Sequence, residues 1–139
     1  MKKIGIISDT HSCWDNSFIK YFKSCDEIWH AGDIGDLTVT DQLMKIAPLK
    51  GVYGNIDNNQ IRQEFPEEIS FNYGAQNIYM THIGGHPKKY NKRCVEKLQE
   101  LKPQILETFK KLSKSFKKFQ KIQKNKIDFQ EKGKVFPKN

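Results

Sequence analysis

Three short apolar runs, each ending in polar side chains, most constrain how this chain can fold. The runs are residues 2–8, 26–30 and 49–55. The first run is nearly continuous and rich in Ile, which is typical of a buried central strand, and the other two runs are predicted to be further short strands. Each run leads into a cluster that contains Asp or Asn, so similar side chains are expected at the carboxyl end of every predicted strand.

Amphipathic segments alternate with these runs. Apolar residues recur at helical spacing at 15–23, 38–47 and 92–102. Residues 67–73 and 76–82 alternate like the two strands of a hairpin. The order of these segments through Pro103 predicts a layered α/β fold, with a mixed β-sheet and flanking helices.

The formal net charge of +8 belongs to the C-terminal part of the chain. Residues 1–103 hold 13 Lys and Arg and 13 Asp and Glu, whereas residues 104–139 hold 11 Lys and three acids. The charge is therefore no evidence about what the first 103 residues bind. We divide the chain into a domain at 1–103 and a Lys-rich tail at 104–139.

The tail at 104–139 has a helical period of apolar residues. These are Ile105, Phe109, Leu112, Phe116, Phe119 and Ile122. The spacing favours a basic amphipathic helix, which could bind nucleic acid or an acidic surface. It could equally cover the sheet or support self-association. A frame-shifted, non-native end to a truncated gene also fits the Lys, Asn, Ile and Phe content, and we expect that origin together with a helical conformation.

The three Cys lack the paired spacing of a disulfide framework or a zinc site, which favours free thiols. The apolar run at the N-terminus ends at Asp9, too early for a signal peptide. No apolar run is long enough to span a membrane. We therefore expect a soluble, cytoplasmic protein.

The polar clusters that follow the predicted strands are expected to meet. They contain Asp9, His11, Asp33, Asp36, Asn55, Asp57 and His82. In an α/β sheet, ligands bind beyond the carboxyl ends of the strands. Carboxylate, imidazole and amide groups suit divalent metals such as Mn, Fe, Ni or Zn. Two such ions about 3.5–4 Å apart can clamp a phosphate and lower the pKa of a bridging water.

Four short motifs resemble those of the calcineurin-like metallophosphoesterases, and the small bacterial and archaeal phosphodiesterase branch is the closest match. They are DTH at 9–11, GDIGD at 32–36, GNID at 54–57 and THIGG at 81–85. The resemblance implies a phosphodiesterase that hydrolyses a small phosphate ester with a metal-bridging hydroxide. It implies two divalent ions, with Mn favoured and Ni, Fe, Zn or Mg as alternatives.

The resemblance also implies a role for each residue of the clusters. Asp9 and His11 would bind the first ion, Asp33 both ions, and Asn55 and His82 the second. Asp33, Asn55 and His82 would then be catalytic. Asp36 and Asp57 would orient the ligands by hydrogen bonds.

The family pattern has one further motif, Gly-His-x-His after another strand, and residues 104–139 contain no His. We therefore expect weak metal binding and impaired activity. A non-catalytic protein-interaction scaffold is the alternative, because the retromer scaffold subunit has a similar fold. His30, at the end of a predicted strand, is expected to be packed or hydrogen-bonded rather than a metal ligand.

Overall fold

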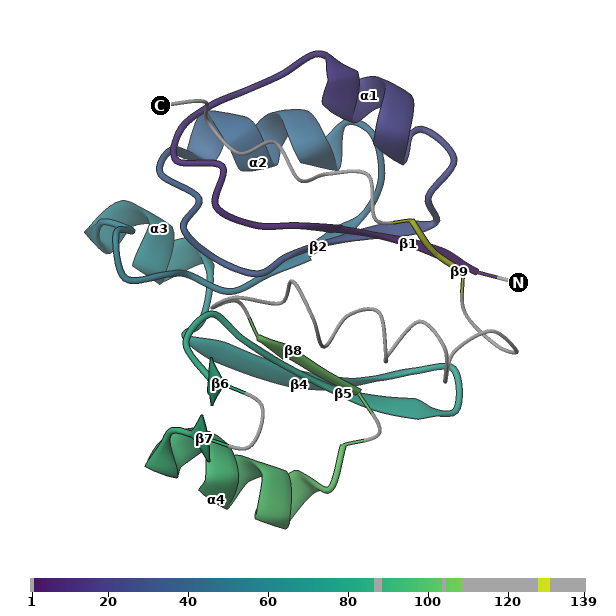
Figure 1. Cartoon of the computed structure of the whole chain (residues 1–139). Coiled ribbons are helices and arrows are strands. Elements are labelled where there is room, and N and C mark those ends of the chain that lie inside the picture. The colour runs from purple at the N-terminus through teal and green to yellow at the C-terminus, as the bar shows by residue number, and fades with distance from the viewer. Residues whose placement is uncertain (1, 87–88, 104, 109–127, 131–139) are drawn as a thin grey trace.

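The protein is built in layers, in which two β-sheets face each other and helices lie on their outer sides (Figure 1). The computed structural model describes residues 2–86, 89–103, 105–108 and 128–130. Helices α1 (Ser17–Phe22) and α2 (Leu37–Met44) cover the first sheet, and α4 (Lys92–Leu101) lies beyond the second. The predicted α/β class with flanking helices is confirmed.

The first sheet is parallel, in the order β3-β2-β1-β9. Its strands are β1 (Lys3–Ile7), β2 (Glu27–His30), β3 (Leu49–Gly51) and β9 (Asp128–Gln130). Since β1 pairs on both sides, the prediction of an interior strand at 2–8 is confirmed. The runs predicted at 26–30 and 49–55 contain β2 and β3, so these two predictions are confirmed as well.

The two faces of the first sheet bury different clusters of apolar side chains. Trp29 of β2 faces the second sheet and packs edge-on against Phe71, with ring centroids 5.1 Å apart. Ile7 of β1 faces the helices, where Phe18 and Phe22 belong to the same buried cluster. The sheet is therefore covered on both faces, as parallel sheets usually are.

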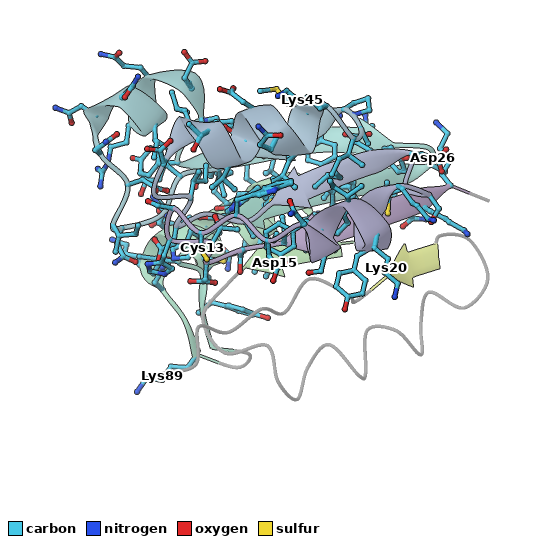
Figure 2. All side chains as sticks on the ribbon, turned by 90° about the horizontal axis from the view of Figure 1, so that it is seen from above. Cys13, Asp15, Lys20, Asp26, Lys45 and Lys89 are labelled. Atoms are coloured by element: carbon cyan, nitrogen blue, oxygen red, sulfur yellow. The ribbon has the colours of Figure 1, made fainter. Side chains whose placement is uncertain are left out.

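The three predicted helices form, with α2 beginning one residue before its expected segment, at Leu37. Polar caps fix where two of them begin. Asp36 caps α2 and Asn91 caps α4 through side-chain oxygens that accept backbone N–H groups. Seen from above, Lys20 of α1 and Lys45 at the end of α2 lie at the surface (Figure 2).

A fourth helix, α3 (Asn59–Glu64), was not predicted. It buries only Ile61, so it gives no periodic apolar pattern, and the Asn58 side chain caps it. A short hairpin of β6 (Gly85–His86) and β7 (Lys89–Tyr90) was likewise not predicted.

The second sheet contains the predicted hairpin, β4 (Glu68–Tyr73) and β5 (Gln76–Thr81), which is confirmed as antiparallel. Its third strand is β8 (Ile105–Thr108), parallel to β5 with Ile78 opposite Ile105. The prediction of a helix is wrong for these four residues. The open edge of β5 supplies backbone partners for β8, and this pairing outweighs the helical spacing of the side chains.

The helical prediction for the tail is also wrong at Asp128–Gln130, which forms β9 beside β1. Residues 109–127 and 131–139 lie outside the described residues, so the helix expected there and its possible contacts stay predictions. Within the part of the chain that the structure describes, no helix is both long and apolar enough to cross a membrane. Cys13, Cys25 and Cys94 form no disulfide with one another.

Candidate metal centre

The loops that follow β1 and β2 run side by side and place their polar residues together. The amide of Asp9 donates to the Gly32 carbonyl at 2.9 Å, and the amide of His11 donates to the Asp33 carbonyl at 3.0 Å. A third bond, from Ser12 to Ile34, extends this pairing. The parallel sheet thus continues as a pair of loops, which bring Asp9 and His11 beside Asp33.

Left-handed backbone conformations are concentrated in these loops. Among the described residues, five non-glycine residues have positive φ, and four of them are Asp9, His11, Ser12 and Asp33, at 45° to 66°. Asp and His tolerate this region better than most residues, but it still carries strain. Strained backbone that the surrounding bonds hold in place is typical of functional sites.

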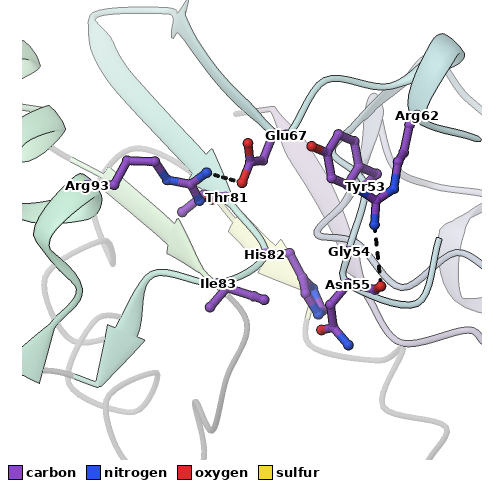
Figure 3. Close-up of a pocket in the computed structure, with 9 residues that line it drawn as sticks. All are labelled: Tyr53, Gly54, Asn55, Arg62, Glu67, Thr81, His82, Ile83 and Arg93. Carbon is purple, nitrogen blue, oxygen red and sulfur yellow. Dashed lines mark hydrogen bonds and ion pairs between the residues drawn. The ribbon is translucent and has the colours of Figure 1, made fainter. Parts of the chain in front are cut away.

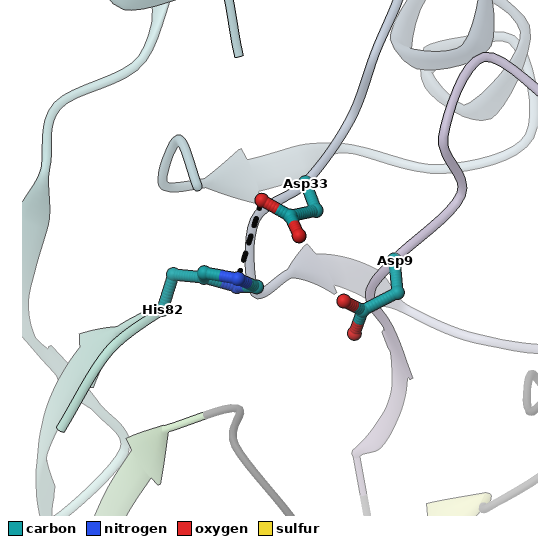
Figure 4. Close-up of side chains that lie close together, drawn as sticks. All are labelled: Asp9, Asp33 and His82. Atoms are coloured by element: carbon teal, nitrogen blue, oxygen red, sulfur yellow. Dashed lines mark ion pairs between the residues drawn. The ribbon is translucent and has the colours of Figure 1, made fainter. Parts of the chain in front are cut away.

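Asp9, Asp33 and His82 each offer a ligand atom, and these three atoms lie within 4.8 Å of one another (Figure 4). His82 Nε2 is 3.2 Å from Asp33 Oδ1. His11 Nε2 is 3.5 Å from Asp33 Oδ2 and 3.8 Å from Asp9 Oδ1. The structure therefore gathers three of the other predicted ligands, Asp9, His11 and His82, around Asp33, and the role of all four as ligands stays a prediction.

The His82 ring is oriented as a metal-binding histidine would be. Its Nδ1 is 2.7 Å from the Ala31 carbonyl oxygen, which can only accept, so Nδ1 carries the proton and donates. In the neutral ring, Nε2 then presents its lone pair toward Asp33. A backbone or carboxylate partner on the second ring nitrogen is the usual support of a metal-ligating histidine.

The donor set fits a divalent cation. Two carboxylates, Asp9 and Asp33, share the centre with the Nε2 lone pair of His82, and a bound cation would offset the repulsion among these electron-rich groups. Oxygen and imidazole donors together suit ions such as Mn²⁺ and Zn²⁺.

Two glycines allow the ligands to approach the backbone closely. A Cβ on Gly32, where φ is +100°, would lie 2.6 Å from His82 Cγ. A Cβ on Gly54 would lie 2.0 Å from Asp33 Oδ1. Any larger side chain at either position would displace a predicted ligand.

Asp57 holds the loops together through backbone groups. Its buried carboxylate accepts the amides of Gly35 at 2.7 Å, Gly54 at 2.7 Å and Ile34 at 3.1 Å. The loop after β3 is thereby tied to the loop that carries Asp33. The resemblance implied that Asp57 orients the ligands, and the structure shows these contacts to backbone amides.

Asp36 was given the same expected role, and its carboxylate lies at the N-terminus of α2. It accepts the Thr38 amide at 2.7 Å. This bond, with a second from the Thr38 hydroxyl, lowers the pKa of Asp36. Any influence of Asp36 on the ligands would therefore pass through the position of α2.

His30 is a buried structural histidine. Its Nδ1 accepts the Gly32 amide at 3.2 Å, so the opposite nitrogen carries the proton and donates to Thr10 Oγ1 at 3.0 Å. The Thr10 hydroxyl in turn donates to the Ile34 carbonyl at 2.9 Å. The interpretation of His30 as hydrogen-bonded rather than a ligand is confirmed.

Burial lowers the pKa of His30 to about 3, while the Asp57 carboxylate opposes the shift and His82 adds to it. His30 is therefore neutral at pH 7. Sequence reasoning missed its partner Thr10, whose position between Asp9 and His11 in the DTH motif was the available signal.

Asn55 lies on the wall of a cavity that opens beside His82 (Figure 3). The cavity has a volume of about 190 Å³ and is lined by Tyr53, Gly54, Asn55, Arg62, Glu67, Thr81, His82, Ile83 and Arg93. Since two predicted ligands line it, a molecule bound at the candidate metal centre would have room to extend into this cavity.

Comparison with known protein families gives a match over most of the chain. The description of the calcineurin-like phosphoesterase superfamily domain fits residues 1–107. The match extends past Pro103 and takes in three of the four residues of β8, the strand that was predicted as helix. No curated protein sequence matches the chain.

Solved structures share the fold. A Thermotoga maritima protein determined by NMR has a TM-score of 0.64 and 24% identity, covering 78% of this chain and 72% of its own. Vps29 from Chaetomium thermophilum has a TM-score of 0.62 and 17% identity, covering 80% of this chain and 67% of its own.

Vps29 from Entamoeba histolytica, in complex with Zn²⁺, has a TM-score of 0.59 and 18% identity, covering 76% of this chain and 62% of its own. The present chain thus spans between 62% and 72% of the length of these three proteins. At these identities the likeness shows the fold alone.

Proposed function

The chain belongs to the calcineurin-like phosphoesterase superfamily, and on that premise we propose that it is a divalent-metal-dependent phosphoesterase that acts on a phosphodiester. The observation that carries the proposal is the group formed by Asp9, Asp33 and His82, whose ligand atoms lie within 4.8 Å of one another. The expected metal is Mn²⁺, with Ni, Fe, Zn or Mg as alternatives.

The positions of the side chains support a division of roles. Asp33 has His82 on one side and His11 on the other, at 3.2 and 3.5 Å, which suits a ligand shared by two ions. Asn55 would add a neutral oxygen, so that the total negative charge stays low enough for a phosphate to enter. Divalent ions bound there would act as Lewis acids on the ester and activate water for attack.

The other residues of the centre would keep these ligands in place. The buried carboxylate of Asp57 fixes the loops after β2 and β3, and the neutral His30 joins the loops after β1 and β2 through Thr10. Preorganised ligands lose little freedom when an ion or a substrate binds. Because residues 104–139 contain no His, we expect this chain by itself to bind metal weakly and to turn over slowly.

A protein-interaction scaffold is the second candidate, since Vps29 from two organisms shares the fold. Metal binding alone does not separate the two candidates, because one of these Vps29 structures is itself a Zn²⁺ complex. Turnover is therefore the observation that decides between them.

The test measures hydrolysis of bis-p-nitrophenyl phosphate with and without Mn²⁺, alongside calorimetric titration of the protein with Mn²⁺. We expect slow turnover that requires Mn²⁺ and disappears in the Asp33→Asn variant. Binding of Mn²⁺ without turnover would favour the scaffold. Faster hydrolysis of the monoester p-nitrophenyl phosphate would contradict the phosphodiesterase part of the proposal.

A further inference from the structure

Two arginines line the cavity beside His82, and their surroundings differ (Figure 3). Arg93 is compensated by acids: its guanidinium pairs with Glu67 and lies 3.5 Å from Glu68 Oε2. It also donates to Thr81 Oγ1 at 3.3 Å. The charge of Arg93 is therefore used to join α4 to the second sheet.

Arg62, in the last turn of α3, is held without an acidic partner. Its Nε donates to the Asp57 carbonyl at 2.7 Å and its Nη2 donates to the Asn55 carbonyl at 3.4 Å. The guanidinium carbon lies 4.6 Å from the centre of the Tyr53 ring. Among the described residues, no carboxylate forms an ion pair with Arg62, so its positive charge is left for something that enters the cavity.

The fixed position of Arg62 suits recognition of an oxyanion. A guanidinium has five N–H donors in a rigid fork, and the two backbone carbonyls do not use all of them. The carbonyls and the Tyr53 ring already restrict the side chain, so little further freedom would be lost on binding. The carbonyl that Nη2 contacts belongs to Asn55, which lines the cavity together with His82.

We propose that the cavity beside His82 is the phosphate subsite of the candidate centre, and that Arg62 binds a non-bridging oxygen of the phosphoryl group there. This proposal rests on the proposed function, because it assumes that metal ions hold the same phosphate from the side of Asp33 and His82. Arg62 is then a substrate-binding residue that reaches the site from α3, outside the four motifs.

Calorimetric titration of the Mn²⁺-loaded full chain with inorganic phosphate tests this role, with wild type, Arg62→Gln and Arg62→Lys compared. Phosphate affinity should fall at least about tenfold in Arg62→Gln, the scale of one charge-assisted hydrogen bond. Arg62→Lys keeps the positive charge but not the forked arrangement of N–H donors. Its phosphate affinity should therefore lie between those of wild type and Arg62→Gln. The control with the same change in net charge is Lys45→Gln, because Lys45 is the exposed residue at the C-terminal end of α2 (Figure 2).

Mn²⁺ affinity and thermal stability of each variant separate substrate binding from a purely structural role. Unchanged Mn²⁺ binding with weakened phosphate binding in Arg62→Gln supports the proposal. Equal phosphate affinity in wild type and Arg62→Gln overturns it, as does a parallel loss of Mn²⁺ and phosphate binding. Failure of the wild type to bind Mn²⁺ contradicts the proposed function instead, so the two failures are distinguishable.

Discussion

The imidazole of His82 donates from Nδ1 to the carbonyl oxygen of Ala31 at 2.7 Å, and this bond links the two sheets at the candidate metal centre. His82 follows β5 of the second sheet, whereas Ala31 follows β2 of the first. The direction of Nε2 toward Asp33 is therefore set by the packing of one sheet on the other.

Asp33→Asn should abolish the rise in melting temperature that Mn²⁺ causes, while changing the metal-free protein little. Asn tolerates the left-handed backbone at this position and keeps an oxygen for the Ile56 amide. Mn²⁺ affinity should fall by more than about 100-fold, since loss of a direct ligand costs more than loss of its hydrogen-bonded support.

Thermal unfolding with and without Mn²⁺ measures the effect of Asp33→Asn through the linkage of binding to stability. Asp41→Asn, an exposed acid on α2, is the control with the same chemical change. An equal Mn²⁺-dependent shift in both variants would exclude Asp33 as a ligand.

Asp57→Asn should destabilise the fold by about 2–4 kcal/mol, because a buried carboxylate that accepts three amides is replaced by a group with one oxygen. One side of the new amide would place N–H donors against N–H donors. Asp36→Asn is the matched control, because Asn caps a helix as well as Asp does. Urea unfolding should show a larger loss of stability in Asp57→Asn than in Asp36→Asn. An equal loss of stability in both variants would show that the three amide bonds contribute little to the free energy of unfolding.

His30 should make the folded state less stable as pH falls below about 6.5. Its pKa is lowered from 6.5 to about 3 in the folded protein, so the unfolded chain binds the proton more readily between these values. The contribution is fully present above pH 6.5 and is lost as pH falls toward about 3. Its slope approaches about 1.4 kcal/mol per pH unit within that window.

Urea unfolding from pH 7 to pH 4.5 measures the His30 effect when wild type is compared with His30→Gln. The Gln amide can accept from the Gly32 amide and donate to Thr10, but it has no proton to gain. The difference in stability should narrow as pH falls, and a difference that stays constant would contradict the assigned titration.

Gly32→Ala should weaken Mn²⁺ binding, because its Cβ would lie 2.6 Å from His82 Cγ and would push the imidazole away. Gly74→Ala is the control, since Gly74 also has positive φ but no atom within 4 Å of the added Cβ. Both variants carry a backbone cost of roughly 1 kcal/mol or more. Only Gly32→Ala should lose Mn²⁺ affinity in calorimetry, and similar affinities would argue against a steric role for Gly32.

The sequence predicted a strand or helix correctly wherever the side-chain pattern of that element was recognisable within a few neighbouring residues. The apolar run of β1 was recognisable because most of its residues are buried, and the hairpin was recognisable because exposure alternates along β4 from Ile69 to Tyr73. Helix α3 was missed because it buries a single residue, Ile61. The four motifs also identified the chemical groups of the candidate centre, although not their orientation.

β8 illustrates what local pattern could not decide. The apolar residues of this segment fit a helical period in the sequence. The β8 backbone nevertheless pairs with β5, which lies more than twenty residues earlier in the chain. Arg62 was missed for a related reason, since its relation to Asn55 and Tyr53 exists only after α3 packs beside the loop.

The sequence by itself determined strands β1 to β5, most of the helices, and which carboxylates and imidazoles follow these strands. Only the tertiary structure decided that β8 is a strand, that His82 Nε2 faces Asp33, and that the Asp57 carboxylate accepts hydrogen bonds from three backbone amides. The physical reason is that side-chain periodicity records burial along one segment. Hydrogen bonds between distant segments depend on how closely those segments approach, and that distance is fixed by the packing of the two sheets.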